Sequence, residues 1–408
     1  TKPKLQRFFD TFSGTYAISI ILLATFFALI FPYLLHIPFL GREGSLYRAL
    51  SFLIAASPCA LIIAIPIAYL SAVSVCAKRG ILIKGGTILD ALSSCKILAL
   101  DKTGTLTTGD LEVLSIKPLL DQEYSIEEAI KAAFTLEQNA VHPIAKAIIA
   151  KAKELRASPE KVENFKQIAG HGLFGIINGK KIWIGRPDFV ASKLEKNGKK
   201  MLEKANQLLA SGEPAACLAI DETAYLFFFK DHVRPEMKKA IEALKKNQKL
   251  EIVMLTGDHE FSAKRIAKEL GIDRYYAGLT PENKLELVSE FSKNKGLAMA
   301  GDGVNDAPAL ARASVGICMG KLGAATAIDA ADIILLHDNI EYLDWLFEKA
   351  HQTKKIVRQN LTLALLAIAV ASLPALLGFI PLWLAVIMHE GGTVLVGLNA
   401  LRLLRIKS

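Results

Sequence analysis

Cysteine is scarce in this 408-residue sequence, which contains five cysteines and no Cys-x-x-Cys pair. An odd number at wide spacing excludes a disulfide framework, and the lack of the pair excludes a metal-binding domain of that type. The thiols are therefore interpreted as reduced side chains of a protein that faces the cytosol. A Gly-rich Walker loop is also missing, so a bound nucleotide must be held differently from that of a P-loop enzyme.

Acidic residues are fewer than basic ones, 40 against 49, which gives a net charge of +9. A basic excess can indicate nucleic acid binding, but here Lys and Arg are scattered and also flank apolar runs, as at 78–79 and 402–407. Basicity at a membrane surface explains this distribution better, so no nucleic acid partner is predicted. The N-terminus shows no cleavable signal peptide.

Long apolar runs are present, although 22% of the residues are charged. Together with the length, this mixture predicts membrane spans combined with soluble domains, and hence a lipid bilayer as partner. Runs long enough to span a membrane cover residues 16–35, 46–76, 361–379 and about 381–404. A polar helix over 342–359 is expected to precede the third run.

Two prolines, Pro58 and Pro66, interrupt the second run. Proline removes a backbone hydrogen bond, and irregular backbone within a membrane is tolerated mainly where it lines a cavity or is buried in protein. The first break reads Ser57-Pro58-Cys59, and a thiol there favours Zn, Co, Cd or Cu(I) over Mg or Ca. The alternative is an ordinary proline kink beside a small apolar cysteine.

The last run carries His389 and Glu390 about halfway along an apolar segment. Ionisable groups within a membrane are costly and are functional hypotheses by default, the alternative being an interfacial pair at the end of a span. A single thiol with imidazole and oxygen ligands suits Zn²⁺ or Co²⁺, with Cd²⁺ possible, better than Cu(I), which prefers several sulfurs. The candidate ligands for a transported metal are Ser57, Cys59, His389, Glu390 and Thr393.

The segment Asp101-Lys102-Thr103-Gly104-Thr105-Leu106-Thr107 follows the apolar run 97–100 directly. It places a carboxylate where a buried strand ends, which is where open α/β sheets carry out chemistry. Asp101 can attack phosphorus and carry the phosphoryl group as an acyl phosphate. Lys102 brings positive charge, and Gly104 allows close approach of the backbone. The alternative is a strand that ends in a polar turn.

Three later turns follow strands or begin helices, at 256–258, 281–284 and 301–306. Each could be an ordinary turn or cap if it stood alone. A phosphoryl group in transfer needs cations and oriented donors, which Thr256 and Lys284 can supply. Asp302, with Asp101 and the carbonyl of Thr103, offers oxygen ligands for Mg²⁺, and Asn305 and Asp306 support that shell.

The region between these motifs changes to amphipathic helix from about residue 118 and is interpreted as an inserted domain that extends to about 228. It contains Glu137, His142-Pro143 and Gly170-His171-Gly172. A His-Pro pair is more often a helix start, and a Gly-x-Gly alone is weak evidence for a binding site.

The segment 101–107 resembles the phosphorylation motif of P-type ATPases, ion pumps that pass through an aspartyl phosphate. Ser57-Pro58-Cys59 and the His-Glu-Gly-Gly-Thr segment 389–393 resemble the signatures of the heavy-metal branch that is associated with cobalt and zinc. The resemblance implies ATP-driven export of zinc, cobalt or cadmium. It also implies that Glu137, His142, Gly170 and Gly172 hold ATP. Thr103, Asp258 and Asn305 are likewise expected to contact the nucleotide, with Mg²⁺ at Asp101, Thr103, Asp302 and Asp306.

The implied fold combines membrane α-helical spans with an α/β haloacid dehalogenase-like phosphorylation domain and an inserted α+β nucleotide-binding domain. The expected boundaries are 1–84 for two spans, 85–117 and 229–348 for the phosphorylation domain, 118–228 for the nucleotide-binding domain, and 349–408 for two further spans. No Thr-Gly-Glu loop of an actuator domain occurs. We therefore expect a C-terminal part of a pump that lacks this domain and the first spans, and that accepts phosphate from ATP better than it releases it.

Three other functions compete with a zinc, cobalt or cadmium pump. A soluble haloacid dehalogenase-like phosphatase would share the Asp101 strand, but it would usually carry a second Asp where Thr103 stands. A copper-transporting P-type ATPase would share the overall plan. A potassium-pump-like or regulatory subunit would bind ATP without transport, which the intact Asp101 argues against. The expected location is a multi-pass membrane protein with its ATP-binding head in the cytosol, in the inner membrane of a bacterium.

Overall fold

The computed structural model describes residues 4–121, 123–138, 140, 142–209, 213–302, 306–319, 325–337 and 339–405. The chain divides into two compact units. The first comprises residues 1–95, 314–321 and 331–408, and the second comprises residues 96–313 and 322–330.

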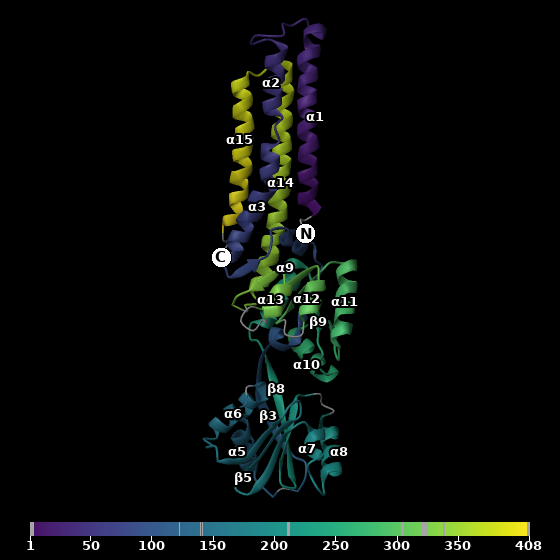
Figure 1. The fold of residues 1–408 in the computed structure, drawn as a ribbon, viewed down its shortest axis with the longest axis vertical. Helices are drawn as coiled ribbons and strands as arrows, with labels where there is room; N and C mark the ends of the chain where they lie inside the picture. Colours follow the sequence, from purple (N-terminus) through teal and green to yellow (C-terminus); the bar gives the residue numbers. More distant parts are fainter. Residues whose placement is uncertain are drawn as a thin grey trace. The chain divides into compact units, whose positions relative to one another are not determined.

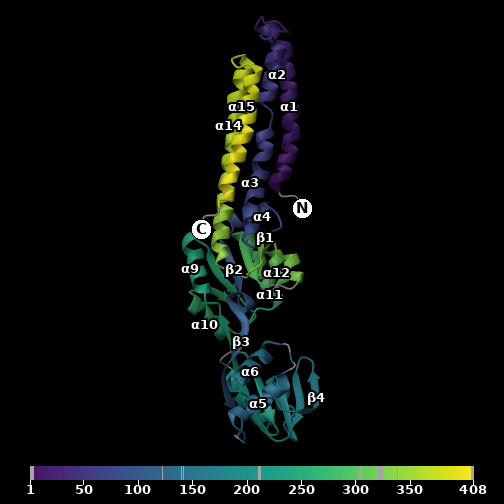
Figure 2. The same cartoon turned by 90° about the vertical axis from the view of Figure 1, so that its left-hand side faces the viewer.

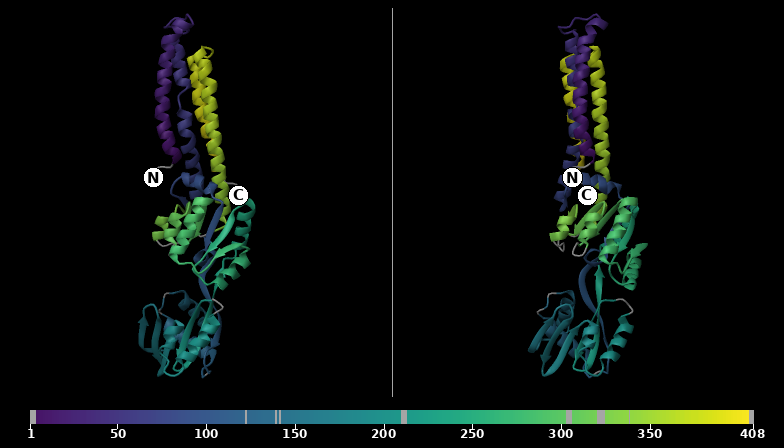
Figure 3. Two further views of the ribbon diagram at one scale, coloured as in Figure 1. Left: turned by 90° about the vertical axis from the view of Figure 1, so that its right-hand side faces the viewer. Right: turned by 45° about the vertical axis from the view of Figure 1, so that its right-hand side comes forward.

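The first unit contains a bundle of long helices that lie side by side in the views of Figures 1 and 2. They are α1 (Lys4–Leu34), α2 (Ser45–Ala55), α3 (Cys59–Lys78), α14 (Tyr342–Leu377) and α15 (Leu382–Leu401), followed by the short η2 (Arg402–Leu404). Four segments among the described residues are long and apolar enough to cross a membrane. Figure 3 shows the same alignment of α1 (purple) with α14 and α15 (yellow-green) from two further sides.

The predicted break at Pro58 is confirmed, because α2 ends at Ala55 and α3 begins at Cys59. Pro66, in contrast, lies inside α3 without ending it. The polar helix expected over 342–359 and the span expected over 361–379 form one continuous helix, α14. No residue between them breaks the helix, and Gly378 ends it with a left-handed φ of 81°.

Short elements complete the first unit. Three strands of the unit lie in the order β1-β13-β12, with β1 (Ile81–Ile83) antiparallel to β13 (Ile333–Leu335) and β12 (Val315–Met319) parallel to β13. The helix α4 (Thr87–Ser94) contacts α14, and Lys354 of α14 donates a hydrogen bond to Ser94.

The second unit contains four parallel strands in the order β11-β2-β9-β10. Every residue of the central strand is buried, as the apolar run 97–100 predicts. The strands are β2 (Ile97–Asp101), β9 (Glu251–Leu255), β10 (Arg274–Tyr276) and β11 (Leu297–Gly301). The helices are α9 (Met237–Gln248), α10 (Glu260–Leu270), α11 (Pro281–Asn294), α12 (Ala307–Arg312) and α13 (Ala325–Ala330).

An antiparallel six-stranded sheet occupies the sequence between β2 and α9, with the order β3-β8-β7-β6-β5-β4. Its strands are β3 (Thr107–Pro118), β4 (Val162–Ile168), β5 (Gly172–Ile177), β6 (Lys180–Gly185), β7 (Ala215–Ile220) and β8 (Thr223–Val233). Helices α5 (Ile126–Glu137) and α6 (Pro143–Glu154) cover one face, and α7 (Pro187–Ala191) and α8 (Gly198–Leu209) cover the other (Figure 1). Strand β3 begins at Thr107, before the boundary expected at 118, and β8 continues to Val233, past the boundary expected at 228.

Candidate functional site

Asp101 is the last residue of β2, and the strand register brings the ends of its two neighbours level with it. It lies beside Leu255 of β9, and its predecessor Leu100 lies beside Ala300 of β11. Thr256 and Asp302 follow these neighbouring strands directly. Parallel strands therefore deliver three polar side chains to one edge of the sheet, as expected at the carboxyl ends of such strands.

Lys284 joins the nucleophile candidate to a second carboxylate. Its Nζ donates hydrogen bonds to Oδ1 of Asp101 and Oδ1 of Asp306, each over 2.6 Å, and all three residues are buried. Burial and then repulsion from Asp306 raise the pKa of Asp101, although Lys284 opposes the rise. Burial lowers the pKa of Lys284, but attraction by Asp101 and Asp306 outweighs it and raises that pKa.

Three carboxylates meet at this site, since ligand atoms of Asp101, Asp302 and Asp306 all lie within 4.8 Å of one another. One ammonium group cannot neutralise three carboxylates, and the remaining negative charge fits a hard cation such as Mg²⁺, which prefers oxygen ligands. The three residues line a cavity of about 400 Å³ together with Thr103, Thr256, Asp258 and Lys284. Asn305, which the sequence predicts to support this ligand shell and to contact the nucleotide, lies outside the described residues.

Thr256 is buried at this edge, and its Oγ1 accepts a hydrogen bond of 3.0 Å from the backbone N–H of Asp258. The hydroxyl proton therefore stays available to an incoming oxygen. Asp258 forms an ion pair with the buried Lys102. Lys102 thus holds the 256–258 turn against segment 101–107, so its charge is already shared with a carboxylate.

Gly104 is required by the geometry of the segment η1 (Lys102–Leu106). Its φ of 72° lies in the left-handed region. A Cβ at this position would also lie 2.7 Å from Oδ2 of Asp302. The glycine therefore lets the backbone approach the carboxylate cluster.

Glu137 and His142 come together between α5 and α6. Oε2 of Glu137 lies 3.1 Å from Nε2 of His142, although within the described part of the chain this oxygen accepts no aligned hydrogen bond. Burial raises the pKa of Glu137 to about 7 and lowers the pKa of His142. Nδ1 of His142 caps α6 by accepting from the N–H of Ala145, so the neutral ring carries its proton on Nε2.

Gly170 and Gly172 differ in their surroundings. Gly170 has a φ of 73° and open space where a Cβ would stand. At Gly172 a Cβ would lie 2.1 Å from the carbonyl oxygen of Ile184, because β5 and β6 pair there as Gly172 with Gly185. The close pairing of strands is by itself a sufficient reason for glycine at 172, whereas Gly170 lies on an accessible turn.

The membrane candidates lie at one level of the bundle. Cys59 begins α3 with an exposed side chain, and its Sγ is 3.2 Å from Oγ of Ser57. Ala385 and Met388 of α15 pack against Ala55 just before the break, and Val396 packs against Ala60 just after it. His389 and Thr393 are half-buried between these contacts, and Glu390 is exposed. In the described part of the chain, Cys59, His389 and Glu390 do not form a metal-ligand cluster of the kind seen at Asp101.

Comparison with known proteins concerns both the residues around Asp101 and the candidate metal ligands in the membrane helices. Residues 95–314, more than half of the chain, match the family of haloacid dehalogenase-like hydrolases. The chain is 40% identical to a probable cadmium/zinc-transporting ATPase, chloroplastic, of Arabidopsis thaliana, over 98% of the chain and 53% of that protein. The catalytic domain of the CPx-ATPase CopB-B is 31% identical with a TM-score of 0.55, over 68% of the chain and 98% of that structure. The chain belongs to the family of haloacid dehalogenase-like hydrolases, and the curated relatives it is similar to are metal-transporting ATPases.

A solved structure of a P-type ATPase of this kind extends the likeness to the membrane helices. A zinc-transporting PIB-type ATPase in its E2.Pi state is 35% identical with a TM-score of 0.79, over 98% of the chain and 64% of that structure. The chain spans about half the length of the curated relatives it matches.

Two further residues of the chain support segment 101–107, although the sequence patterns did not single them out. Nη2 of Arg234 donates a hydrogen bond of 2.9 Å to the carbonyl of Gly104. Asp231 is buried and accepts from Oγ1 of Thr107 over 2.6 Å and from the N–H of Gly109 over 3.2 Å. The charged residues of segment 231–235 were the available signal, since charged side chains directly after an apolar strand need partners.

Proposed function

We propose that the chain is the phosphorylated and metal-binding part of an ATP-driven exporter of a divalent transition metal. The observation that carries the proposal is the arrangement at the end of β2, where Lys284 bonds to Asp101 within a cluster of carboxylates. The similarity to curated ATPases supports an ATPase reaction at this arrangement. The names of the relatives, which include cadmium and zinc, support a metal as the transported ion.

In the proposed reaction, a carboxylate oxygen of Asp101 attacks the γ-phosphorus of ATP. A phosphorus–oxygen bond forms to Asp101, the bond to the β–γ bridging oxygen breaks, and ADP leaves with that electron pair. Lys284 moves its hydrogen bond from the carboxylate to a phosphoryl oxygen, and the hydroxyl of Thr256 donates to another. Asp101, Asp302 and Asp306 with the carbonyl of Thr103 would hold Mg²⁺, which when bound neutralises phosphate charge.

The inserted domain is the proposed ATP-binding domain. No Walker loop occurs, so the nucleotide is bound through a different arrangement, for which Glu137, His142 and the turn at Gly170 are the candidates. The proton on Nε2 of His142 is a donor for an acceptor on the nucleotide. Asp258 and Asn305 are proposed to act near the phosphates.

The transported metal is proposed to be Zn²⁺, Cd²⁺ or Co²⁺, bound at the break between α2 and α3. Cys59 is the single thiol there, and His389 of α15 lies level with it through the packing of Val396 and Met388. One soft and one borderline ligand with nearby oxygens suit these ions better than Cu(I). We place the ATP-binding head in the cytosol and the helices in the inner membrane of a bacterium.

Labelled ATP with Mg²⁺ tests the proposal. The chain should acquire an acid-stable, hydroxylamine-labile phosphate, and Asp101→Asn should abolish it. Asp110→Asn is the matched control, because Asp110 is an exposed carboxylate on the neighbouring β3. Equal labelling of wild type and Asp101→Asn would refute Asp101 as the nucleophile.

A further inference from the structure

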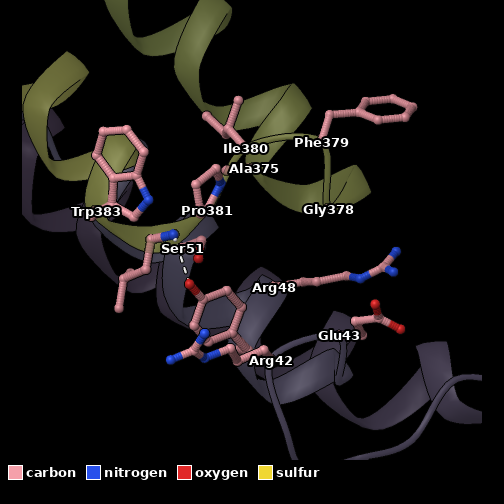
Figure 4. A pocket seen from close by; sticks show the side chains of 12 residues that line it. Arg42, Glu43, Arg48, Ser51, Ala375, Gly378, Phe379, Ile380, Pro381 and Trp383 are labelled. Carbon is pink, nitrogen blue, oxygen red and sulfur yellow. Dashed lines mark hydrogen bonds between the residues drawn. The ribbon is translucent and has the colours of Figure 1, made fainter.

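A second cavity, of about 810 Å³, lies in the membrane bundle, and its lining residue Ala375 packs with Ala55 just before the break at Pro58. It is enclosed by the start of α2, the end of α14 and the start of α15 (Figure 4). This is the end of the bundle opposite Lys78 and Tyr342, since Arg48 of α2 bonds to the carbonyl of Leu377 at the end of α14. Neither the proposed transport chemistry nor the phosphorylation site uses it.

The cavity contains polar groups whose hydrogen-bonding capacity is not used. Ser51 is fully buried, and its Oγ has no partner among the described residues. Nε of Arg48 is also buried without a described partner, although Nη1 donates to Leu377. A buried polar atom without a partner costs roughly 1–3 kcal/mol, so an occupant that bonds to these groups would be stabilised.

The charge of the lining favours an anion. Two arginines, Arg42 and Arg48, line the cavity with a single carboxylate, Glu43. Arg42 is exposed, and its guanidinium bonds to no residue in the described part of the chain. In Figure 4 the two guanidinium groups extend in opposite directions from the wall. An occupant with acceptors spread over several atoms therefore fits better than a compact ion.

The surroundings indicate a lipid as the source of that anion. Trp383 and Phe379 line the cavity yet are 62% and 78% exposed. The hydroxyl oxygen of Tyr47, which also lines the cavity, accepts a hydrogen bond of 2.9 Å from the N–H of Leu382. Aromatic residues at span ends mark the depth of lipid head groups. Leu373 and Leu377 leave an exposed apolar surface on α14 along which acyl chains can lie.

We propose that this cavity binds the phosphate-bearing head group of an anionic phospholipid, with Ser51 and Arg48 contacting the head group and Arg42 supplying charge. The acyl chains then follow the apolar surface of α14. This site is independent of the metal and nucleotide proposals and would persist if either failed.

Native mass spectrometry of the full chain from mixed micelles tests the site. The probes are phosphatidylglycerol, diacylglycerol with the same acyl chains, and inorganic phosphate. One phosphatidylglycerol should stay bound while diacylglycerol does not, and Arg42→Gln should weaken retention roughly tenfold through loss of a charge-assisted contact. Ser51→Ala should weaken it about fivefold without harming the fold, because it removes only an unpartnered hydroxyl.

Arg358→Gln is the matched control, since Arg358 is an exposed arginine nearer the other end of α14. It should leave retention unchanged, and an equal loss would mean general attraction to a basic surface and overturn the site. Equal retention of diacylglycerol, or unchanged retention in both Arg42→Gln and Ser51→Ala, would also overturn it. Displacement of the lipid by submillimolar inorganic phosphate would identify a free anion as the occupant and refute a lipid site.

Discussion

Gly104 shows how one residue can shape the proposed phosphorylation site without contributing a functional group. Its left-handed backbone is unfavourable for other residues by roughly 1–2 kcal/mol. A side chain there would also meet the carboxylate of Asp302 at 2.7 Å. Backbone strain and displacement of a predicted Mg²⁺ ligand therefore coincide at one position.

We expect Gly104→Ala to reduce phosphorylation of the chain by labelled ATP far more than it reduces stability. Displacement of Asp302 by about an ångström can cost roughly 100-fold in rate. Gly271→Ala is the matched control, since Gly271 has a φ of 68° but open space around its missing Cβ. Both variants should show a similar fall in unfolding midpoint, and similar labelling of both would contradict the role assigned to Gly104.

At this scale the sequence predicts the site well where a residue ends a strand. Asp101, Thr256 and Asp302 are brought together because parallel strands share an edge, and a buried apolar run followed by a polar turn reveals each of them. The contacts between the residues of the site were harder to predict from the sequence. The ion pair of Lys102 with Asp258 and the bond from Arg234 to Gly104 depend on how turns fold back, which periodicity does not encode.

Among the helices, too, some features can be predicted from the sequence and others cannot. Proline marks the break at Ser57-Pro58-Cys59, because the residue before a proline is disfavoured in a helix. Pro66 carries the same signal but remains inside α3, where neighbouring helices support it. The change from amphipathic to apolar sequence near residue 360 indicates two elements, yet α14 continues because a change of surroundings does not break hydrogen bonds between backbone groups.

Tyr69 links the membrane helix α3 to α4, the element that precedes β2 in sequence. Its hydroxyl donates a hydrogen bond to Oδ2 of Asp90, while Oδ1 of Asp90 is buried without a partner among the described residues. A Cβ at Gly86 would lie 2.3 Å from Cβ of Tyr69, so the two segments are in close contact. The carboxylate therefore depends on one donor.

Tyr69→Phe should destabilise the membrane unit by about 1.5–3 kcal/mol, since it removes a charge-assisted hydrogen bond and leaves a carboxylate unsatisfied. Thermal unfolding in detergent measures the effect. Tyr33→Phe is the control, because Tyr33 is 82% exposed. Asp90→Asn in the Tyr69→Phe background should recover part of the loss, and a full additive loss would show that the two residues do not interact.

At the scale of the whole molecule, one unit contains the proposed phosphorylation site and the other contains the candidates for binding the transported metal. Sequence patterns predict residues for both sites, but how closely the fold brings those residues together differs between the two sites. The carboxylate oxygens of Asp101, Asp302 and Asp306 lie at one edge of a sheet, where the fold already brings them close together. Cys59 and His389 lie on separate helices, α3 and α15, whose relative positions depend on the packing of apolar residues such as Ala60 and Val396.

The cysteines offer a direct test of the metal site, because Cys59 is the one exposed thiol and the other four are buried. A maleimide should therefore modify Cys59 first in the folded chain. Zn²⁺, Cd²⁺ or Co²⁺ bound there should protect it, and Ca²⁺ should not, since Ca²⁺ does not favour sulfur ligands. The expected protection applies to micromolar metal and is read from the rate of labelling.

If the imidazole shares the ion with the thiolate, His389→Ala should remove most of the protection by Zn²⁺. His232→Ala is the control, because it changes an exposed histidine of the other unit, and it should leave the protection unchanged. Cu(I) would protect through sulfur alone and would be indifferent to His389, so the variant separates a zinc-type site from a copper-type one. Undiminished protection by Zn²⁺ in His389→Ala would remove α15 from the metal site. The break at Pro58 would then bind the ion through α2 and α3 alone.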